Sequence, residues 1–397
     1  MRKGWEYKKL GEVGKIVTGS TPSTKDESNY SPREYCFVKP SDLPSQGIAD
    51  IEETEYYVSK VGLSKSRVLP SGSVLVSCIG SIGKIGILTK EACSNQQINA
   101  IIPQDEIDSR FIAYSLYAQR FVLESIANAP VVPIINKTDF SKITIGIPPK
   151  STQLAIVSEL DKINELIRLK KEQLKDFDNL AQSLFYEMFG DPVENEKGWE
   201  VKKLEDICSL ICNGNTPKGG SEVYVDNGIL FLRSQNVWKN RLDLDDVAFI
   251  DEATHKSLKK SALNHYDLLI TKTGRVNTEN SSLGRTALFE GEDGSANING
   301  HVYLVRLKEG MVHKYVLYIL ISNSYRELIR RTCVGGIDKR QLNKNHIEDF
   351  PIIFPPLSLQ RLFAQRVEQI EREKSEVQKS IQDLETLLAS RMQYWFE

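Results

Sequence analysis

The side chains of this sequence that could carry out catalysis do not assemble into a recognisable motif. Glu6–Lys8 and Glu200–Lys202 both read Glu-x-Lys, like the acid-x-lysine fragment of a nuclease, but no partner carboxylate accompanies either one. The stretch 80–84 lacks the spacing and the Ser or Thr of a phosphate-binding loop. The proline pairs in 147–150 and 354–357 do not match the Asn/Asp-Pro-Pro-aromatic motif of an adenine methyltransferase. We therefore expect no catalytic residues in this chain.

The cysteines and histidines also lack the spacing of a metal site. Cys208 and Cys212 are four residues apart, but no His or second Cys pair lies nearby in the sequence. All five histidines lie in the second half of the chain, so we interpret them as surface or core residues. We expect six reduced thiols in a cytosolic protein that binds neither a metal nor a cofactor itself.

Length, charge and hydropathy narrow the class of protein further. A chain of 397 residues is long enough for about two or three domains. Its net charge of −2 gives it no overall basic character, so a nucleic-acid partner would need a local basic face. No apolar run approaches the ~20 residues of a membrane helix, and the first ten residues lack the apolar core of a signal peptide. We expect a cytoplasmic protein without membrane contact.

The elements that must position the polar side chains are organised around a long helix predicted from Thr152 to Met188. Its apolar residues alternate in steps of four and three, which is typical of a coiled-coil seam, and no Pro or Gly interrupts them. At about 1.5 Å per residue, this helix would be roughly 55 Å long. The seam residues are Ile156, Leu160, Ile163, Ile167, Leu174, Phe177, Ala181, Leu184 and Met188, with Lys170 in the one polar position.

The same pattern returns near the other end of the sequence. A second seam runs from Phe363 to Trp395, offset by 207 residues from the first (363 − 156 = 207). A Pro-Pro-x-x-x-Gln sequence precedes each seam, at 148–153 and at 355–360. Since proline cannot continue a strand or sit inside a helix, each pair marks the end of the preceding element and the start of the helix. Ser151 and Ser358 are the predicted helix caps. Two seams in identical register indicate a duplication.

The globular stretches before the two helices are also repeated. The repeated features are Gly-Trp-Glu at 4–6 and 198–200, Gly-x-Thr-Pro at 19–22 and 214–217, glycine-broken apolar runs at 73–88 and 267–288, predicted strands at 74–79 and 268–271, and predicted helices at 111–121 and 315–329. The offset grows from 194 to 207 residues, which predicts insertions in loops of the second copy.

These observations predict an α+β protein in which two similar globular domains are joined by two long helices. The helices are expected to form an antiparallel coiled coil, which makes the molecule pseudo-twofold symmetric. The predicted boundaries are 1–150 for the first domain, 151–190 for the central helix, 191–356 for the second domain and 357–397 for the C-terminal helix.

In its duplicated order of motifs, the whole chain resembles the specificity subunit of type I restriction–modification enzymes. The residues that carry the resemblance are Gly-Trp-Glu, Gly-x-Thr-Pro and the Pro-Pro-x-x-x-Gln helix starts, each present twice. The sequence departs from the usual Pro-Pro-Leu-x-Glu-Gln form at Thr152-Gln153 and Leu359-Gln360, which affects only the detail of the helix starts.

The resemblance implies two target recognition domains, each reading one half of a bipartite site on double-stranded DNA. It implies that the helices serve as spacer and as docking surface for two modification (methyltransferase) subunits, which use S-adenosylmethionine. It also implies restriction subunits that translocate DNA with ATP and Mg²⁺ and cleave it. The chain itself would be non-catalytic.

Within that resemblance, we expect DNA contacts from amide, hydroxyl and cationic side chains on the loops of both domains. In the first domain these are Ser20, Thr21, Lys39, Ser41, Ser81, Lys84, Gln96, Gln97 and Lys137; in the second they are Asn215, Thr216, Lys218, Arg233, Gln235, Asn236, Lys272, Arg275, Asn277, Arg285, Asn299, Lys339 and Arg340. Glycines 80, 83, 335 and 336 are expected to shape turns instead.

Other readings stay open from the sequence alone. The chain could be the specificity subunit of a related type II system, or a spare gene copy that exchanges domains by recombination. It could also be a coiled-coil adaptor with duplicated protein-binding heads.

The two predicted helices also carry apolar residues outside their seams, which predict that another protein surface covers them. These residues are Leu166, Leu169, Leu180, Phe185, Leu387 and Phe396.

Overall fold

The computed structural model describes residues 2–127, 132–276, 278, 280–336 and 339–397. The chain divides into two compact units. The first unit comprises the residues up to Lys171 together with Lys379–Glu397, and the second unit comprises Glu172–Gln378. Each unit therefore contains one globular part and a segment of each long helix.

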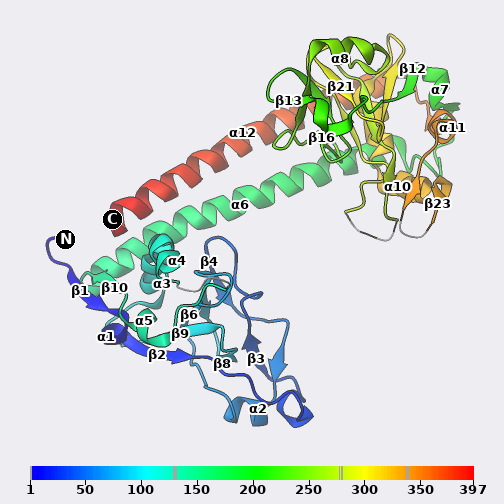
Figure 1. Ribbon diagram of the computed structural model, residues 1–397. Coiled ribbons are helices and arrows are strands. Elements are labelled where there is room, and N and C mark those ends of the chain that lie inside the picture. The colour runs from blue at the N-terminus through cyan, green and yellow to red at the C-terminus, as the bar shows by residue number, and fades with distance from the viewer. Residues whose placement is uncertain (1, 128–131, 277, 279, 337–338) are drawn as a thin grey trace. The chain divides into compact units, whose positions relative to one another are not determined.

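The globular part of the first unit is built on a five-stranded and a three-stranded sheet (Figure 1). Its elements are β1 (Glu6–Lys9), α1 (Leu10–Val13), β2 (Gly14–Thr18), η1 (Glu27–Asn29), β3 (Tyr35–Val38), β4 (Ile48–Ile51), β5 (Tyr57–Val58), α2 (Lys60–Ser64), β6 (Val74–Ser77), β7 (Ile85–Leu88), β8 (Ala92–Ser94), β9 (Ile98–Pro103), α3 (Ser109–Ala118), α4 (Arg120–Ile126), α5 (Lys137–Ser141) and β10 (Thr144–Ile147). The larger sheet has the order β2-β9-β6-β7-β4, and the smaller has the order β5-β3-β8.

The second unit repeats this plan with additional short strands. Its elements are β11 (Val201–Lys203), α7 (Leu204–Ile207), β12 (Cys208–Asn213), η2 (Gly220–Val223), β13 (Tyr224–Val225), β14 (Ile229–Leu232), β15 (Val237–Trp238), β16 (Arg241–Leu242), β17 (Ala248–Ile250), α8 (Glu252–Ser257), η3 (Lys259–Ser261), β18 (Leu268–Thr271), β19 (Thr273–Gly274), β20 (Thr286–Leu288), β21 (Ala296–Ile298), β22 (Val302–Leu307), α9 (His313–Leu320), α10 (Asn323–Thr332), β23 (Val334–Gly335), β24 (Arg340–Gln341), α11 (Lys344–Glu348) and β25 (Pro351–Ile353). The order β12-β22-β18-β20 matches β2-β9-β6-β7, and β17-β14-β21 matches β5-β3-β8.

The two long helices are α6 (Lys150–Phe189) and α12 (Leu357–Phe396), as the seam patterns predicted. They pair within each unit and run antiparallel there (Figure 1). In the first unit, Glu159 bonds Arg391 and Lys171 bonds Glu385, so rising numbers on α6 meet falling numbers on α12. In the second unit, Asp178 bonds Lys374, and the rings of Phe185 and Phe363 lie 5.5 Å apart.

The seam residues belong to the hydrophobic cores of the units. The seam residues Ile156 and Leu160 of α6 are buried in the core of the first unit together with Met392 of α12, which lies outside the seam. The seam residues Ala181 and Phe363 are buried in the core of the second unit together with Phe185, which lies outside the seam. Burying one phenylalanine side chain contributes about 1.5–3 kcal/mol. The helices are therefore part of each globular fold.

The repeated glutamine of the helix starts has a structural explanation. Gln153 and Gln360 are each 1% exposed, and the Nε2 of each donates to a proline carbonyl, at 3.0 Å to Pro148 O and at 2.8 Å to Pro355 O. Gln153 Oε1 also accepts the Asp108 N–H at 2.9 Å. A buried amide thus anchors the start of each long helix to the segment before it.

Some details of the sequence analysis were wrong. Ser151 and Ser358 lie inside α6 and α12 and do not cap them, because the helices begin at Lys150 and Leu357. Phe185 is buried, and Phe396 packs against the core of the first unit, so neither adds to an uncovered surface.

The predicted helices 111–121 and 315–329 are each divided in two. In the first unit, α3 ends at Ala118 and α4 begins at Arg120. In the second unit, α9 ends at Leu320, and the Ser322 hydroxyl caps α10 by accepting the Tyr325 N–H at 3.3 Å. The Ser322 hydroxyl takes the place of the backbone carbonyl to which the Tyr325 N–H would donate in one continuous helix, so a new helix begins here.

Candidate nucleic-acid interface

The loops that carry the predicted contact residues of the first unit are joined at their bases by backbone hydrogen bonds. The Asn95 N–H donates to Val38 O at 3.0 Å, which joins the turn after β8 to the end of β3. The Cys78 N–H donates to Gln97 O at 2.8 Å, which joins the loop after β6 to the same turn. The loops that follow β3, β6 and β8 are therefore held next to one another.

The turns after β2 and β8 bring four of the predicted residues together. Ser20 N–H donates to Ser94 O at 2.8 Å, and the Ser20 Oγ accepts the Arg67 N–H at 3.2 Å. The Thr21 hydroxyl donates to Gln96 Oε1 at 2.7 Å, and both of these residues are exposed. Gln97 is held differently, because its Oε1 accepts from Asn95 Nδ2 at 2.8 Å.

The turn after β3 places a lysine over an aromatic ring. The Lys39 N–H donates to Asp42 Oδ2 at 2.7 Å and closes the turn, and Ser41 lies exposed within it. Lys39 Nζ lies 3.1 Å from the centre of the exposed Tyr56 ring. A cation in this position is attracted to the ring and yet stays accessible to solvent.

The loop after β6 is closed by the hydroxyl of Ser77. This hydroxyl donates to Ser81 O and accepts the Lys84 N–H at 2.9 Å. Lys84 Nζ donates to Pro40 O at 3.1 Å and ties this loop to the turn after β3. Lys137 stands apart as the exposed first residue of α5.

The second unit repeats the same backbone closures with other side chains. The Asn299 N–H donates to Leu232 O at 3.0 Å, and the Lys272 N–H donates to His301 O at 2.8 Å. The Thr271 hydroxyl donates to Ser282 O and accepts the Arg285 N–H at 2.8 Å. The equivalent positions are Ser20 and Asn215, Thr21 and Thr216, Lys39 and Arg233, Ser41 and Gln235, Ser81 and Ser282, Lys84 and Arg285, and Gln97 and His301.

Three predicted residues of the second unit converge on Asp246. Arg233 Nη2 donates to Asp246 Oδ1 at 3.0 Å, and Gln235 Nε2 donates to Asp246 Oδ2 at 2.6 Å. Asn236 is 2% exposed, accepts the Arg233 N–H at 2.9 Å and donates to Asp246 O at 2.7 Å. Its buried amide holds the turn, so Asn236 is not available to contact a base.

Of the predicted residues of the second unit, Gln235, Arg275, Arg285 and Lys339 line an open pocket of about 620 Å³. Arg275 and Lys339 are exposed in its wall, and Arg340 pairs with Gly274 where β24 meets β19. Asn277 lies outside the described residues. The pocket is lined by Ser234, Gln235, Trp238, Thr273, Gly274, Arg275, Thr278, Asn280, Ser281, Ser282, Arg285 and Lys339.

Five further predicted residues, on the loop after β12 and beyond the ends of β18 and β21, are also not among those that line this pocket. Asn215, Thr216 and Lys218 are exposed on the loop after β12. Lys272 Nζ lies 5.8 Å from the centre of the Tyr303 ring, and Asn299 Oδ1 accepts the His301 N–H at 3.0 Å. Lys272 and Asn299 therefore have local partners of their own.

A basic cluster around Trp238 was missed by the sequence analysis. Arg285 Cζ lies 3.8 Å and Arg241 Cζ lies 5.3 Å from the centre of the Trp238 ring. The pKa of Lys239 is lowered mainly by burial and, to a smaller extent, by the charge of Arg326. Burial, followed by the charges of Arg326 and Arg241, lowers the pKa of Arg285. The run Trp-Lys-Asn-Arg at 238–241, an aromatic residue among basic ones, was the available signal.

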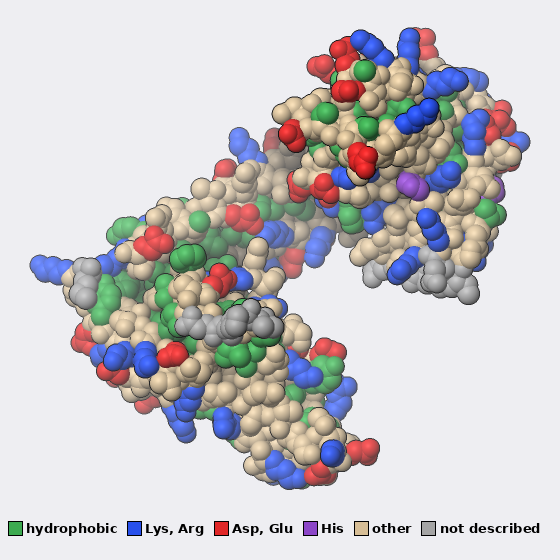
Figure 2. Space-filling view, viewed as in Figure 1, with side chains coloured by type: hydrophobic (Ala, Val, Ile, Leu, Met, Phe, Trp, Pro, Cys, Tyr) green, Lys and Arg blue, Asp and Glu red, His purple; other side chains and the backbone are tan. Residues whose placement is uncertain are grey.

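This clustering of cations favours an anionic ligand. In Figure 2, Lys and Arg side chains lie around the edge of the second unit that carries α10 and β23. Neighbouring cations repel one another, and a phosphate group placed between them would relieve that repulsion.

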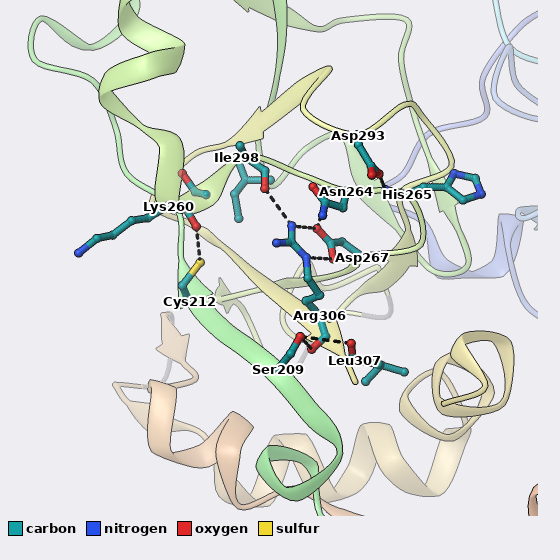
Figure 3. A network of polar contacts seen from close by, with 12 residues as sticks. Ser209, Cys212, Lys260, Asn264, His265, Asp267, Asp293, Ile298, Arg306 and Leu307 are labelled. Carbon is teal, nitrogen blue, oxygen red and sulfur yellow. Dashed lines mark hydrogen bonds and ion pairs between the residues drawn. The ribbon is translucent and has the colours of Figure 1, made fainter. Parts of the chain in front are cut away.

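A buried ion pair supports the sheet behind these loops (Figure 3). The Asp267 side chain is 1% exposed, and its two carboxylate oxygens accept from Arg306 Nε at 2.9 Å and Arg306 Nη2 at 2.7 Å. Asp267 Oδ2 also accepts the Asn264 N–H at 2.7 Å. The hydrogen bonds to Asp267 raise the pKa of the Arg306 guanidinium.

The arrangement suits polar recognition of a large surface. The exposed groups are hydroxyls, amides and cations on loops, which are the groups that contact base edges and phosphates. Among the described residues, no group of three or more His, Cys, Asp or Glu side chains could hold a metal ion. Within the same part of the chain, no helix has the length and apolar character needed to cross a membrane.

The sequence and the fold match known proteins over nearly the whole chain. The type I restriction modification DNA specificity domain matches residues 2–176 and 196–386. The type I restriction enzyme MjaIX specificity subunit of Methanocaldococcus jannaschii is 26% identical over 383 residues, covering 91% of this chain and 85% of that protein.

Two solved structures share the fold. A chain from a study of complex assembly and conformational transition of the type I R-M system superposes with a TM-score of 0.62 at 18% identity, covering 100% of this chain and 98% of that one. The S subunit of a type I restriction–modification system from M. genitalium gives a TM-score of 0.54 at 14% identity, covering 98% and 95%.

Proposed function

The chain belongs to the type I restriction modification DNA specificity family, and we propose that each of its globular units reads one half of a bipartite duplex site. As a specificity subunit of a type I restriction–modification system, it binds DNA within a complex of several subunits and is not itself the catalyst. This assignment disfavours the reading as a protein-binding adaptor. A related type II system stays an alternative to be tested.

One observation carries the proposal: equivalent positions on equivalent loops hold different donors and acceptors. Lys39 corresponds to Arg233, and Ser41 corresponds to Gln235. The backbone closures beneath these side chains are the same in both units. Because donor and acceptor patterns select base edges, two domains with one framework and different side chains would read different half-sites.

The test is an exchange of one domain. Residues 191–356 would be replaced by the same region of a relative, and methylated motifs would be mapped genome-wide in cells that express the whole complex. We expect one half of the motif to change and the other to persist. A change in both halves, or a continuous palindromic motif in the wild type, would count against the proposal.

We further propose that α6 and α12 determine the gap between the half-sites. Four residues inserted after Lys170 would advance one helix by about 6 Å and rotate the residues beyond the insertion by about 40°. On DNA, 6 Å is nearly two base-pair steps of about 3.4 Å each. The half-site letters should survive and the gap should lengthen, or binding should fail. An unchanged gap with full activity would contradict the spacer role.

We also propose that the helices dock two modification subunits through exposed leucines. Leu180 and Leu387 are 52% and 46% exposed and are offset by the 207 residues of the repeat. Each is therefore available to one copy of the same partner. Leu166 and Leu169 add further exposed apolar surface, so the isolated subunit should be poorly soluble or bind DNA weakly.

Single variants test this docking surface. Leu180→Gln and Leu387→Gln should each remove one modification subunit, as counted by native mass spectrometry of the complex. Ser183→Gln and Ser390→Gln are matched controls, because these exposed helix residues are also offset by 207. A full complex with both leucines replaced would sink the proposal. S-adenosylmethionine, ATP and Mg²⁺ would be bound by modification and restriction subunits.

A further inference from the structure

The loop between β18 and β20 is longer than its counterpart in the first unit. The bond that closes it, from Arg285 N–H to Thr271 Oγ1, spans 14 residues. The bond that closes the loop after β6, from Lys84 N–H to Ser77 Oγ, spans 7. A loop of twice the length loses more conformational entropy on ordering, so it needs additional support.

Arg285 supplies that support from within the loop. Its Nε–H donates to Ser281 O at 3.1 Å, and its Nη2 donates to Asn280 O at 2.5 Å. A planar guanidinium can satisfy two carbonyl groups in one rigid arrangement, which a lysine ammonium on a flexible stem cannot reproduce. In the first unit, Lys84 needs only one bond, to Pro40 O, to hold the shorter loop.

Trp238 holds the guanidinium from outside the loop. The Arg285 Cζ lies 3.8 Å from the centre of the Trp238 ring, and the hairpin β15–β16 carries that ring. Trp238 Nε1 is buried and has no hydrogen-bond partner among the described residues. Stacking, and not a hydrogen bond of the indole, therefore links the hairpin to the loop.

Arg285 and Trp238 line the same pocket as the exposed Arg275. Arg275 lies near the start of this loop, whereas Asn280 and Ser281, which Arg285 holds, lie near its end. The stacked pair thus anchors the far end of the segment that presents Arg275.

We propose that Arg285, stacked on Trp238, is a positioning residue that orders the described residues of this loop, 273–276, 278 and 280–282, and thereby sets the specificity of the second half-site. This inference rests on the function proposed above and replaces a direct DNA contact by Arg285. The side chains exposed on the ordered loop would contact DNA, while Arg285 and Trp238 keep them in place.

The experiment uses the complete complex with its modification subunits. Methylation would be mapped at cognate sites and at sites with one mismatch in either half. Arg285→Lys and Trp238→Ala should raise methylation at second-half mismatches, relative to cognate sites, by about tenfold, which corresponds to about 1.4 kcal/mol. Discrimination in the first half should not change. Trp238→Phe keeps a flat ring and should restore most of the wild-type discrimination.

A second measurement separates positioning from contact. Arg275→Ala should weaken DNA binding and reduce the salt slope of binding by about one, as the loss of a phosphate contact does. Arg285→Lys should leave that slope unchanged. Lys84→Met is the control in the first unit, and it should affect first-half mismatches only.

Several outcomes would overturn the inference. Equal loss of discrimination in both halves would make the effect a general one. The inference would also be wrong if both Arg285→Lys and Trp238→Ala discriminated against mismatches like the wild type. It would be wrong as well if only Arg285→Lys changed the discrimination, because the stacked pair should act as one unit. Hydrogen exchange in β12, β18 and β22 shows whether a variant is misfolded. If the variants are folded, a Trp238→Phe complex with the same discrimination as Trp238→Ala would contradict the stacking role. A wild-type complex without a bipartite motif would instead refute the proposed function itself.

Discussion

The two units make the same backbone connections at their loops but differ in the sheet beneath them. The pair Asp267 and Arg306 of the second unit corresponds by strand register to Ser73 and Ile102 of the first. Ser73 donates its hydroxyl to Pro70 O at 2.7 Å, and no charge is buried there. Any residue except proline can donate a backbone hydrogen bond, so the shared framework does not depend on the side chains that differ. Divergence of recognition is thus compatible with one fold.

Removing the buried charge should affect the units most unequally. Asp267→Ala leaves the 28% exposed Arg306 without its carboxylate, although Arg306 Nη2 keeps its bond to Ala262 O at 3.1 Å, and should destabilise the second unit by about 3 kcal/mol. Ser73→Ala should cost the first unit only about 1 kcal/mol, the worth of one hydrogen bond. Hydrogen exchange of peptides from each unit measures both losses separately. Similar losses in the two units would show that the ion pair adds nothing beyond the hydroxyl.

The glycines before the first loop should behave alike in both units. A Cβ at Gly19 or at Gly214 would lie closer than 3.0 Å to the backbone oxygen of Asn95 or Asn299. Gly19→Ala and Gly214→Ala should each cost about 1–3 kcal/mol, because backbone must move. The same peptide-level exchange compares them. A clear difference would mean that the loop frameworks are less similar than their hydrogen bonds indicate.

The hydroxyl that closes the loop should matter somewhat more in the second unit. Ser77→Ala removes its two hydrogen bonds and should cost about 1 kcal/mol. Thr271→Val removes the equivalent pair from a loop twice as long, which should add roughly 0.6 kcal/mol. Exchange rates of the loop amides report the effect. A larger loss in the first unit would contradict the role assigned to loop length.

The smallest expected difference is in pH dependence. Burial lowers the pKa of His313 below its usual value of about 6.5. The folded second unit then binds fewer protons than the unfolded chain, so its stability should fall as the pH drops below about 6.5, until the folded-state pKa is passed. His313→Gln should remove this slope in denaturant titrations followed by exchange. All five histidines lie in the second half of the sequence, so the first unit provides the control.

The sequence predicted the features that depend on a period. Ile156 and Phe363 repeat in steps that only a helix places on one face, and both are buried. The repeated Gln153 was visible, but its carbonyl partner, Pro148, could only be assigned from the structure. The structural roles of Asn236 and Trp238 could be assigned only from the structure, because they depend on contacts with residues 246 and 285, which are distant in the sequence. Local patterns identify elements, whereas loop contacts depend on tertiary structure.

The division of the chain between the units determines the order in which they can fold during synthesis. The second unit is one continuous stretch, Glu172–Gln378, and all of it has been made before Lys379. The first unit needs Leu388, Met392 and Trp395, which pack in its core but are translated after every residue of the second unit. The half that leaves the ribosome first therefore waits for residues beyond Lys379, and a polypeptide that stops before this lysine holds a complete second unit beside an unfinished first one.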